Sequence, residues 1–306
     1  MICDSVSSSE SPSAVAECKI GDLALDRARV MGILNITTDS FSDGGRFIDK
    51  ADALQQAEHM LNEGADIIDV GGESTRPGAM QVDQQEELDR VIPVVEQVVA
   101  ELGARVSIDT SKPTVMRAAV AAGAVMINDV RALSLPGAIE AAVDAATEGV
   151  VVCVMHMQGS PENMQENPHY TNVVREVSAF LSDACSGAIE SGIPARQLLI
   201  DPGFGFGKTT QHNLQLLQNL DELCSSGFAV LAGLSRKRMF ADILANAGQA
   251  GNYQGTRLHA SVAAAQIAVS RGARVVRVHD VEPTVHALKV LEWTQKQGRT
   301  ALESMP

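Results

Sequence analysis

The sequence of 306 residues predicts an α/β fold, a (β/α)8 TIM barrel, because short runs rich in Val and Ile alternate about eight times with longer stretches of helical spacing. No segment of disordered composition separates these units, which favours one domain. Polar residues follow the apolar runs along the whole chain, and a barrel collects the carboxyl ends of all its strands on one rim. A doubly wound open sheet is the alternative, but it would concentrate such residues at one switch point.

The strands and helices are assigned in chain order from these periods. Candidate strands are 29–34, 66–70, 105–108, 125–127, 150–155, 198–200, 229–231 and 274–276. Helices are expected to begin near Asp49, Asp83, Lys112, Pro136, Asn172, Gln211, Gln254 and Glu282. Behind Asp83 the apolar residues recur at steps of three and four, and Glu86 is placed for a capping box.

Composition and charge limit the class of protein. Apolar residues make up 45% of the chain and charged residues 20%, and no uninterrupted apolar run approaches a bilayer span, so a soluble globular protein without membrane contact is expected. The net charge of −14 argues against nucleic acid as a partner, since a phosphate backbone needs a concentrated basic face. The telling cations lie in Gly/Ser/Pro segments or at the ends of apolar runs and suggest a pocket for a small anion: Arg76, Lys208, Arg236, Lys237 and Arg277.

The five cysteines are scattered and form no C-x-x-C pair, so neither a disulfide framework nor a zinc cluster is expected. A reducing compartment, the cytoplasm, fits best. Residues 1–20 contain no basic stretch leading into an apolar one, and we expect a flexible leader there, followed by a single barrel domain over 21–300.

Two glycine-rich loops could hold an anion. Asn35 ends the first strand and opens a loop of hydroxyl, amide and glycine residues that could meet a phosphate or a hydrated Mg²⁺. The loop over 71–78 has the same character and adds Thr75 and Arg76. Ordinary solvated turns remain the alternative for both loops.

Asp109, Asn128 and Asp201 each come directly after an apolar run, so a barrel would bring them to the rim of an apolar interior, where an unpaired carboxylate is costly. Two acids and an amide in one pocket suit a 2-amino-4-oxo heterocycle, which offers N–H donors. The alternative for each is a helix cap, as for Asp109 before the helix near Lys112.

Two cationic clusters, 235–237 and 277–279, follow the last two strands, where barrels often bind phosphate. Lys237 or Arg277 taken alone would more often be a surface cation. We interpret His156 as a packed histidine. The glycine-rich segment before Lys208 resembles an ATPase phosphate loop only superficially, and nothing indicates a protein nucleophile.

Six motifs occur together in order between about residues 30 and 290: GILNITTDSFSDGG (32–45), GADIIDVGGESTRPG (64–78), SIDTSKP (107–113), DPGFGFGK (201–208), SRK (235–237) and RVHDV (277–281). Together they resemble the dihydropteroate synthase family. The resemblance implies a (β/α)8 barrel, usually a homodimer, that condenses 6-hydroxymethyl-7,8-dihydropterin diphosphate with 4-aminobenzoate, with Mg²⁺ as cofactor.

The resemblance also assigns roles to matched positions. For the pterin it implies Asp109, Asn128, Met155, Asp201, Phe206 and Lys237; for the diphosphate, Asn35, Thr75, Arg76, Arg277 and His279, with Asn35 also meeting the metal. For 4-aminobenzoate it implies Phe41, Pro77, Phe206, Ser235 and Arg236. The catalytic set is then Asp109, Lys237, Arg277 and His279.

One departure concerns the first loop, where Thr38 replaces a proline that is usual in the family and so removes a fixed backbone angle. Two other functions compete with the synthase. A pterin-binding paralogue would keep the pocket without the activity, and a methyltetrahydrofolate-dependent methyltransferase would share the barrel but lack the first loop and the 235–237 and 277–279 clusters. For a synthase, sulfonamides are expected to compete with 4-aminobenzoate.

Overall fold

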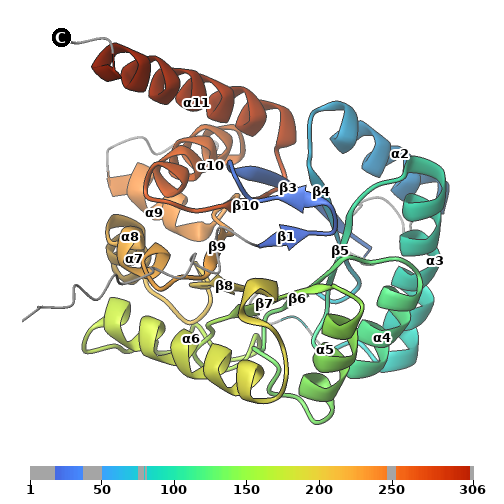
Figure 1. Cartoon of the computed structure of the whole chain (residues 1–306). Coiled ribbons are helices and arrows are strands. Elements are labelled where there is room, and N and C mark those ends of the chain that lie inside the picture. Colours follow the sequence, from blue (N-terminus) through green and yellow to red (C-terminus); the bar gives the residue numbers. More distant parts are fainter. Residues whose placement is uncertain (1–17, 37–49, 75–78, 80, 247–252, 304–306) are drawn as a thin grey trace, which may run out of the picture.

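The computed structural model describes residues 18–36, 50–74, 79, 81–246 and 253–303. Eight parallel strands close into a barrel in the order β10-β3-β4-β5-β6-β7-β8-β9 (Figure 1). The strands are β3 (Arg29–Asn35), β4 (Ile67–Gly71), β5 (Val106–Asp109), β6 (Met126–Asp129), β7 (Val151–Met155), β8 (Leu198–Asp201), β9 (Ala229–Ala232) and β10 (Val275–Val278). The barrel prediction is confirmed, and a closed sheet rules out the doubly wound alternative.

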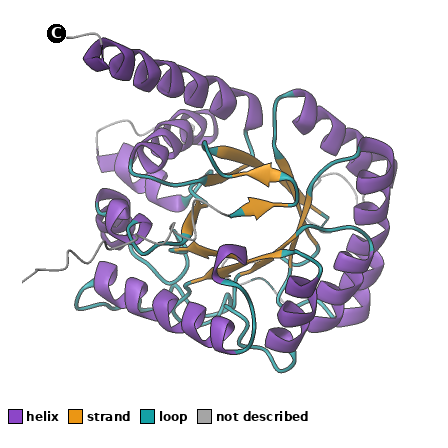
Figure 2. Cartoon of the chain, viewed as in Figure 1, coloured by secondary structure: helices purple, strands orange, loops and turns teal. Residues whose placement is uncertain are grey.

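Helices surround the barrel and bury one face of each strand (Figure 2). They are α2 (Lys50–Asn62), α3 (Gln84–Leu102), α4 (Pro113–Ala121), α5 (Ala138–Thr147), α6 (Val173–Glu190), the 3-10 helix η1 (Ala195–Gln197), α7 (Thr210–Gln218), α8 (Leu220–Cys224), α9 (Arg238–Asn246), α10 (Tyr253–Ser270) and α11 (Val281–Glu303). The larger apolar core lies between these helices and the strands. Among the described residues no helix is both long enough and apolar enough to cross a membrane.

The predicted strands and helix starts all lie within two residues of the observed ones. The helix behind Asp83 shows where the local prediction was right and where it was wrong. The Asp83 side chain caps α3 by accepting a hydrogen bond from the backbone N–H of Gln85 at 2.8 Å. Glu86 does not complete a capping box, because its carboxylate pairs with Arg90 one turn later.

A hairpin that the sequence analysis did not predict closes the amino-terminal end of the barrel. Its strands β1 (Lys19–Ile20) and β2 (Leu23–Ala24) pair antiparallel across a two-residue turn, in which Gly21 has a φ of +60° that glycine adopts without strain. In Figure 1, β1 lies within the ring of strands. Apolar hairpin side chains pack on residues of the barrel strands in a second core: Cys18, Ile20, Leu23 and Leu25 against Met31, Ile67, Met126, Val151, Cys153, Leu199, Ala229, Leu231 and Val275.

The folded domain therefore begins earlier than predicted. We placed residues 18–20 in a flexible leader, but Cys18 and Ile20 are buried in the second core. The expectation of a leader over residues 1–17 lies outside the described residues.

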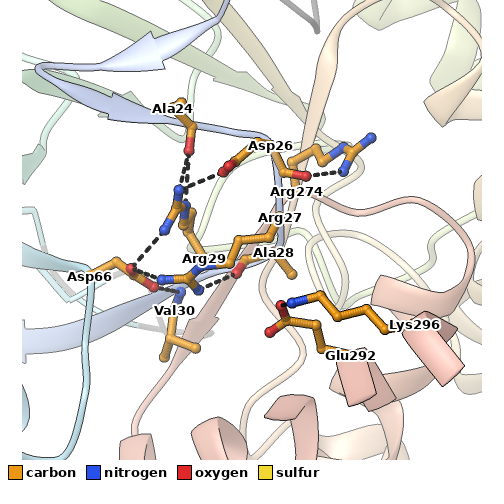
Figure 3. A network of polar contacts seen from close by, with 10 residues as sticks. All are labelled: Ala24, Asp26, Arg27, Ala28, Arg29, Val30, Asp66, Arg274, Glu292 and Lys296. Atoms are coloured by element: carbon orange, nitrogen blue, oxygen red, sulfur yellow. Dashed lines mark hydrogen bonds and ion pairs between the residues drawn. The ribbon is translucent and has the colours of Figure 1, made fainter. Parts of the chain in front are cut away.

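A buried arginine ties the hairpin to the barrel (Figure 3). Arg29, at the start of β3, donates from Nε and Nη2 to the carbonyl oxygen of Ala24 at 2.9 and 2.6 Å. Its Nη1 also donates at 3.3 Å to Asp66, whose other carboxylate oxygen accepts from the backbone N–H of Val30 at 2.9 Å. The closed end is thus held by polar contacts as well as by apolar burial, which leaves the opposite rim for a ligand.

Candidate active site

Strand register brings the predicted polar residues together on the carboxyl rim. Asn35 of β3 pairs with Gly71 of β4, Gly71 pairs with Asp109 of β5, and Asp109 pairs with Asn128 of β6. Four neighbouring strands therefore carry one row of positions at the same height. Gly71 has no side chain, and a Cβ there would lie 3.6 Å from both Asn35 Oδ1 and Asp109 Oδ2. The row thus keeps open space between the amide and the carboxylate.

A pocket enclosing about 470 Å³, its open mouth included, lies over this rim. That volume is in the range of sites for small organic ligands. The residues that line it come from most of the barrel strands and from the loops after β8 and β9: Ile33, Asp109, Asn128, Val130, Met155, Asp201, Phe204, Phe206, Gly233, Ser235, Lys237, Arg277 and His279. Every predicted pterin-contacting residue is among them.

Arg277 lies between two carboxylates on the pocket floor. Its Nη2 donates to Asp109 Oδ2 at 2.6 Å, and its Nε donates to Asp69 Oδ2 at 2.5 Å. Burial raises the pKa of Asp109 to about 7, because Arg277 offsets only part of the cost of a buried charge and Asp69 adds repulsion. Asp109 does not cap the following helix α4, whose N-cap residue is Lys112 and which has no side-chain cap hydrogen bond, so the helix-cap alternative is excluded for Asp109.

Asp201 and Lys237 are two further ionisable groups that line the pocket. Asp201 Oδ1 accepts from the backbone N–H of Gly203 at 2.7 Å, and burial raises the pKa of the carboxyl. Burial lowers the pKa of Lys237 to about 8, against the opposing effect of Asp201. Lys237 Nζ lies 4.4 Å from the centre of the Phe206 ring, a cation–π contact that holds the ammonium over an aromatic wall.

His279 and Ser235 join the ends of β10 and β9. Ser235 Oγ lies 3.0 Å from His279 Nδ1 and accepts from the His279 backbone N–H at 3.1 Å. Burial, with the nearby Arg277 charge, lowers the pKa of His279 to about 3. The imidazole is therefore neutral near pH 7, and it can offer a hydrogen bond to a diphosphate but no positive charge.

Lys208 is buried beneath the loop that carries Phe206. Its Nζ lies 2.9 Å from His156 Nδ1 and donates to the carbonyl oxygens of Gly203 at 2.9 Å and Phe206 at 3.0 Å. Burial lowers the pKa of Lys208 to about 7. Burial and the nearby Lys208 charge together lower the pKa of His156 to about 3. These contacts confirm that His156 is a packed histidine, and they show that Lys208 fixes a loop and does not present a phosphate site.

Some predicted site residues are not brought to this pocket. Arg236 is not among the lining residues; its Nε and Nη2 donate to Asp280 at 3.0 and 2.5 Å, and its side chain is half exposed. Asn35 lies on the rim beside the pocket but is not among its lining residues. The predictions for Thr38, Phe41, Thr75, Arg76 and Pro77 lie outside the described residues.

Asp69 is a site residue that the sequence analysis missed. It lies inside β4, and its side chain is fully buried against Arg277 and Asn128. The usable signal was a lone acid within the apolar run 67–70, because a carboxylate rarely enters a buried strand without a cationic partner.

The residues present are compatible with Mg²⁺ held mainly by a ligand's phosphates. In the described part of the chain, no group of three His, Cys, Asp or Glu side chains could hold a metal on its own. Asn35 offers a neutral amide oxygen at the rim, close to the Asp109 carboxylate. Mg²⁺ commonly keeps several waters and takes one or two protein oxygens beside substrate phosphates, so this sparse set suits it.

The sequence profile of the family described as "Pterin binding enzyme" matches residues 31–279, and the chain therefore belongs to that family. A curated relative, dihydropteroate synthase of Haemophilus influenzae, is 51% identical over 272 residues, which cover 89% of this chain and 96% of the relative. Within the family, then, the chain falls among the dihydropteroate synthases.

Two solved structures agree with this placement. The dihydropteroate synthase of Yersinia pestis, solved with a sulfonamide drug complex, superposes with a TM-score of 0.83 at 47% identity and covers 90% of this chain and 96% of its own. The dihydropteroate synthase of Xanthomonas albilineans, solved with 4-aminobenzoic acid, has a TM-score of 0.81 at 50% identity and covers 93% of this chain and 96% of its own.

Proposed function

We propose that this chain condenses 6-hydroxymethyl-7,8-dihydropterin diphosphate with 4-aminobenzoate to give 7,8-dihydropteroate and diphosphate. The observation that carries the proposal is the combination of Asp109, Asn128 and Asp201 with Lys237 and Arg277 in one pocket. Acceptors for N–H groups and donors for an anion then lie within the span of one pterin diphosphate. The high identity to dihydropteroate synthases over most of the chain supports the same reaction.

The acceptor side of the pocket suits the pterin. Asp109, Asn128 and Asp201 would accept hydrogen bonds from the amine and ring N–H groups, and Lys237 would donate to a ring acceptor such as the 4-oxo oxygen or a ring nitrogen. Met155 gives the heterocycle an apolar surface at the end of β7. Burial of the two carboxylates strengthens these hydrogen bonds, because the surroundings have a low dielectric constant.

The diphosphate would lie toward Arg277 and His279 at the end of β10. Arg277 supplies positive charge and His279 a neutral hydrogen bond. Asn35, Thr75 and Arg76 remain the further residues that we propose for this end of the substrate, with Asn35 as the protein ligand of Mg²⁺. When bound there, Mg²⁺ would neutralise charge on the diphosphate oxygens.

The chemistry requires no protein nucleophile. The C–O bond between the pterin methylene and the diphosphate breaks, and its electron pair leaves with the diphosphate. The cationic methylene is delocalised into the pterin ring, and the ionised Asp109 carboxylate stabilises that positive charge. The amine nitrogen of 4-aminobenzoate then forms the new C–N bond and releases one proton. A pocket that excludes water at this stage protects the cation from hydrolysis.

The 4-aminobenzoate ring would lie near Phe206 and Ser235, which line the pocket on the side of Lys237. Phe41 and Pro77 are further residues that we propose for this ring. Sulfonamides should therefore compete with 4-aminobenzoate in steady-state kinetics at saturating pterin diphosphate. Inhibition that does not weaken as 4-aminobenzoate is raised would contradict a shared site.

Release of diphosphate by the purified protein tests the proposed function. The assay contains the dihydropterin diphosphate and Mg²⁺, with and without 4-aminobenzoate, and the pterin product is identified by mass. Release that depends on 4-aminobenzoate and yields dihydropteroate is the expected result. Binding of the pterin diphosphate without release would instead identify a catalytically weak paralogue, for which Thr38→Pro is the first change to make. Methyl transfer from methyltetrahydrofolate would favour the methyltransferase.

We also propose a homodimer formed through the neighbouring helices α10 and α11. The support is the exposure of Val290 and Trp293 on α11, at 65% and 66%, and of Ile267 on the neighbouring helix α10. Trp293→Glu should convert the dimer to a monomer in sedimentation measurements, and a wild-type monomer would contradict the proposal. The cytoplasm remains our proposed location, in keeping with the four described cysteines, all of them free thiols.

A further inference from the structure

Asp69 is a buried carboxylate that reaches two residues with different tasks. It lies inside β4 with no exposed surface, and it is not among the residues that line the pocket. Its Oδ2 accepts from Arg277 Nε at 2.5 Å and from Asn128 Nδ2 at 3.2 Å. Its Oδ1 has no partner among the described residues. A buried carboxylate with one unpaired oxygen is costly for folding, so a structural role alone accounts poorly for it.

The contact with Arg277 fixes the plane of the guanidinium group. Nε is held by Asp69 and Nη2 by Asp109, so two of the three nitrogens point at carboxylates on neighbouring strands. Nη1 has no partner among the described residues, and Arg277 lines the pocket. An arginine held at two points loses less freedom when its remaining donors bind an anion.

The contact with Asn128 fixes which end of the amide faces a ligand. A carboxylate only accepts hydrogen bonds when it is ionised, so Asp69 selects the NH₂ end of Asn128. The carbonyl oxygen Oδ1 is then left for the pocket that Asn128 lines. With the amide reversed, Asn128 would present a donor to the N–H groups of a pterin and repel them.

We propose that Asp69 is a positioning residue that fixes Arg277 for the diphosphate and the amide of Asn128 for the pterin. The proposal rests on the proposed function for the identity of the substrate. In this proposal the buried Asp69 carboxylate contacts neither the pterin nor the diphosphate, and it holds in place the residues that bind each of them.

The test compares Asp69→Asn with Asp129→Asn as a matched control. Asp129 is also a fully buried carboxylate near the rim, but its partners are Ser111 Oγ and the backbone N–H groups of Arg131 and Leu133. The control therefore removes a buried charge that makes no hydrogen bond to Arg277 or to the Asn128 side chain. Binding of inorganic diphosphate and of unphosphorylated 6-hydroxymethyl-7,8-dihydropterin is measured by calorimetry for each folded variant.

Asp69→Asn should weaken binding of each probe by about tenfold or more, the size expected when a hydrogen bond to a charged group is lost. Asp129→Asn should lower the melting temperature and leave both affinities within about twofold of wild type. Equal affinity losses in the two variants, or none in Asp69→Asn, would overturn the proposal. Because binding is the readout, these outcomes are separate from the diphosphate-release assay, which tests the proposed function itself.

A double-mutant cycle isolates the part that acts through Arg277. In an Arg277→Lys background, which lacks the Nε–H donor, Asp69→Asn should change the affinity for inorganic diphosphate by less than about twofold. A full additional loss in that background would overturn the assignment. If Asp69→Asn does not fold, the wild-type protein still tests the contact. The Arg277 Nε–H resonance, identified by its disappearance in Arg277→Lys, should exchange slowly with solvent in the free enzyme, and fast exchange would contradict the contact.

Discussion

Replacing Gly203 by alanine should damage both the stability of the barrel and its pocket. Gly203 has a φ of +67°, and a Cβ there would lie 1.9 Å from the backbone carbonyl oxygen of His156. Gly103, at the end of α3, has a φ of +60° with nothing within 4 Å of the same position. The two glycines share the backbone conformation and differ in the close approach, so Gly103→Ala is a matched control.

The expected losses follow from these two geometries. An alanine in the left-handed region costs about 1 kcal/mol, which is the whole of the expected loss in Gly103→Ala. In Gly203→Ala the chain must also move to relieve a clash between backbone and Cβ, and overpacking of this kind costs about 1–3 kcal/mol. That movement disturbs the carbonyl oxygen of His156, which accepts from Lys208 Nζ at 3.3 Å. We therefore expect a total loss of about 3 kcal/mol in Gly203→Ala.

Urea unfolding with linear extrapolation measures both values, and unchanged m-values would show that the comparison is valid. Calorimetry with the pterin diphosphate gives the functional readout. Its affinity should fall in Gly203→Ala, because the Gly203 N–H that orients Asp201 moves, and should stay unchanged in Gly103→Ala. Equal destabilisation of the two variants would show that the approach of Gly203 to His156 is not a constraint, and the reasoning would fail.

Three further predictions concern charged groups. Burial raises the pKa of Asp109 to about 7, with Asp69, Glu87 and Asp129 adding to the shift and Arg277 opposing it. Pterin affinity should therefore fall as the pH drops below about 7. In calorimetry, Asp109→Asn should bind the pterin weakly and with no such dependence on pH. Lys237→Ala should reduce kcat/KM by about tenfold or more, since it removes a donor and a cation from the pocket; wild-type kinetics would refute the assignment. Burial lowers the pKa of His156 from 6.5 to about 3 in the folded state, so between these two pH values the unfolded state binds more protons than the folded state. The free energy of unfolding therefore decreases as the pH falls from 6.5 towards 3. Between pH 7 and pH 5 this loss is roughly 2 kcal/mol, and urea unfolding should show it reduced by that amount in His156→Asn.

Much of the fold and the rim could be predicted from local sequence pattern. Strands buried on both faces read as continuous Val- and Ile-rich runs, and the alternation with helices fixes the topology. Because parallel strands share one carboxyl edge, Asp109, Asn128 and Asp201 could be placed in one pocket without coordinates.

What could not be predicted depends on contacts between distant residues. The β1–β2 hairpin has strands of two residues each, too short to show a period, and it is held by apolar packing and polar contacts with barrel residues far along the chain. The partner of Asp69 is more than two hundred positions away, and Arg236 pairs with Asp280, which belongs to a different motif. The low pKa of His279 comes first from its burial, which the sequence does not reveal, and then from Arg277, two positions before it in the chain.

The hairpin that closes the amino-terminal end of the barrel also decides how the protein can be handled. The pocket lies at the carboxyl rim, whereas the first described residues lie at the amino-terminal end of the barrel. Lys19, on the exposed side of β1, presents its side chain to solvent at that closed end. A dye or a surface linker joined to the Lys19 amine would leave the mouth of the pocket open to solution, which suits binding measurements on immobilised protein.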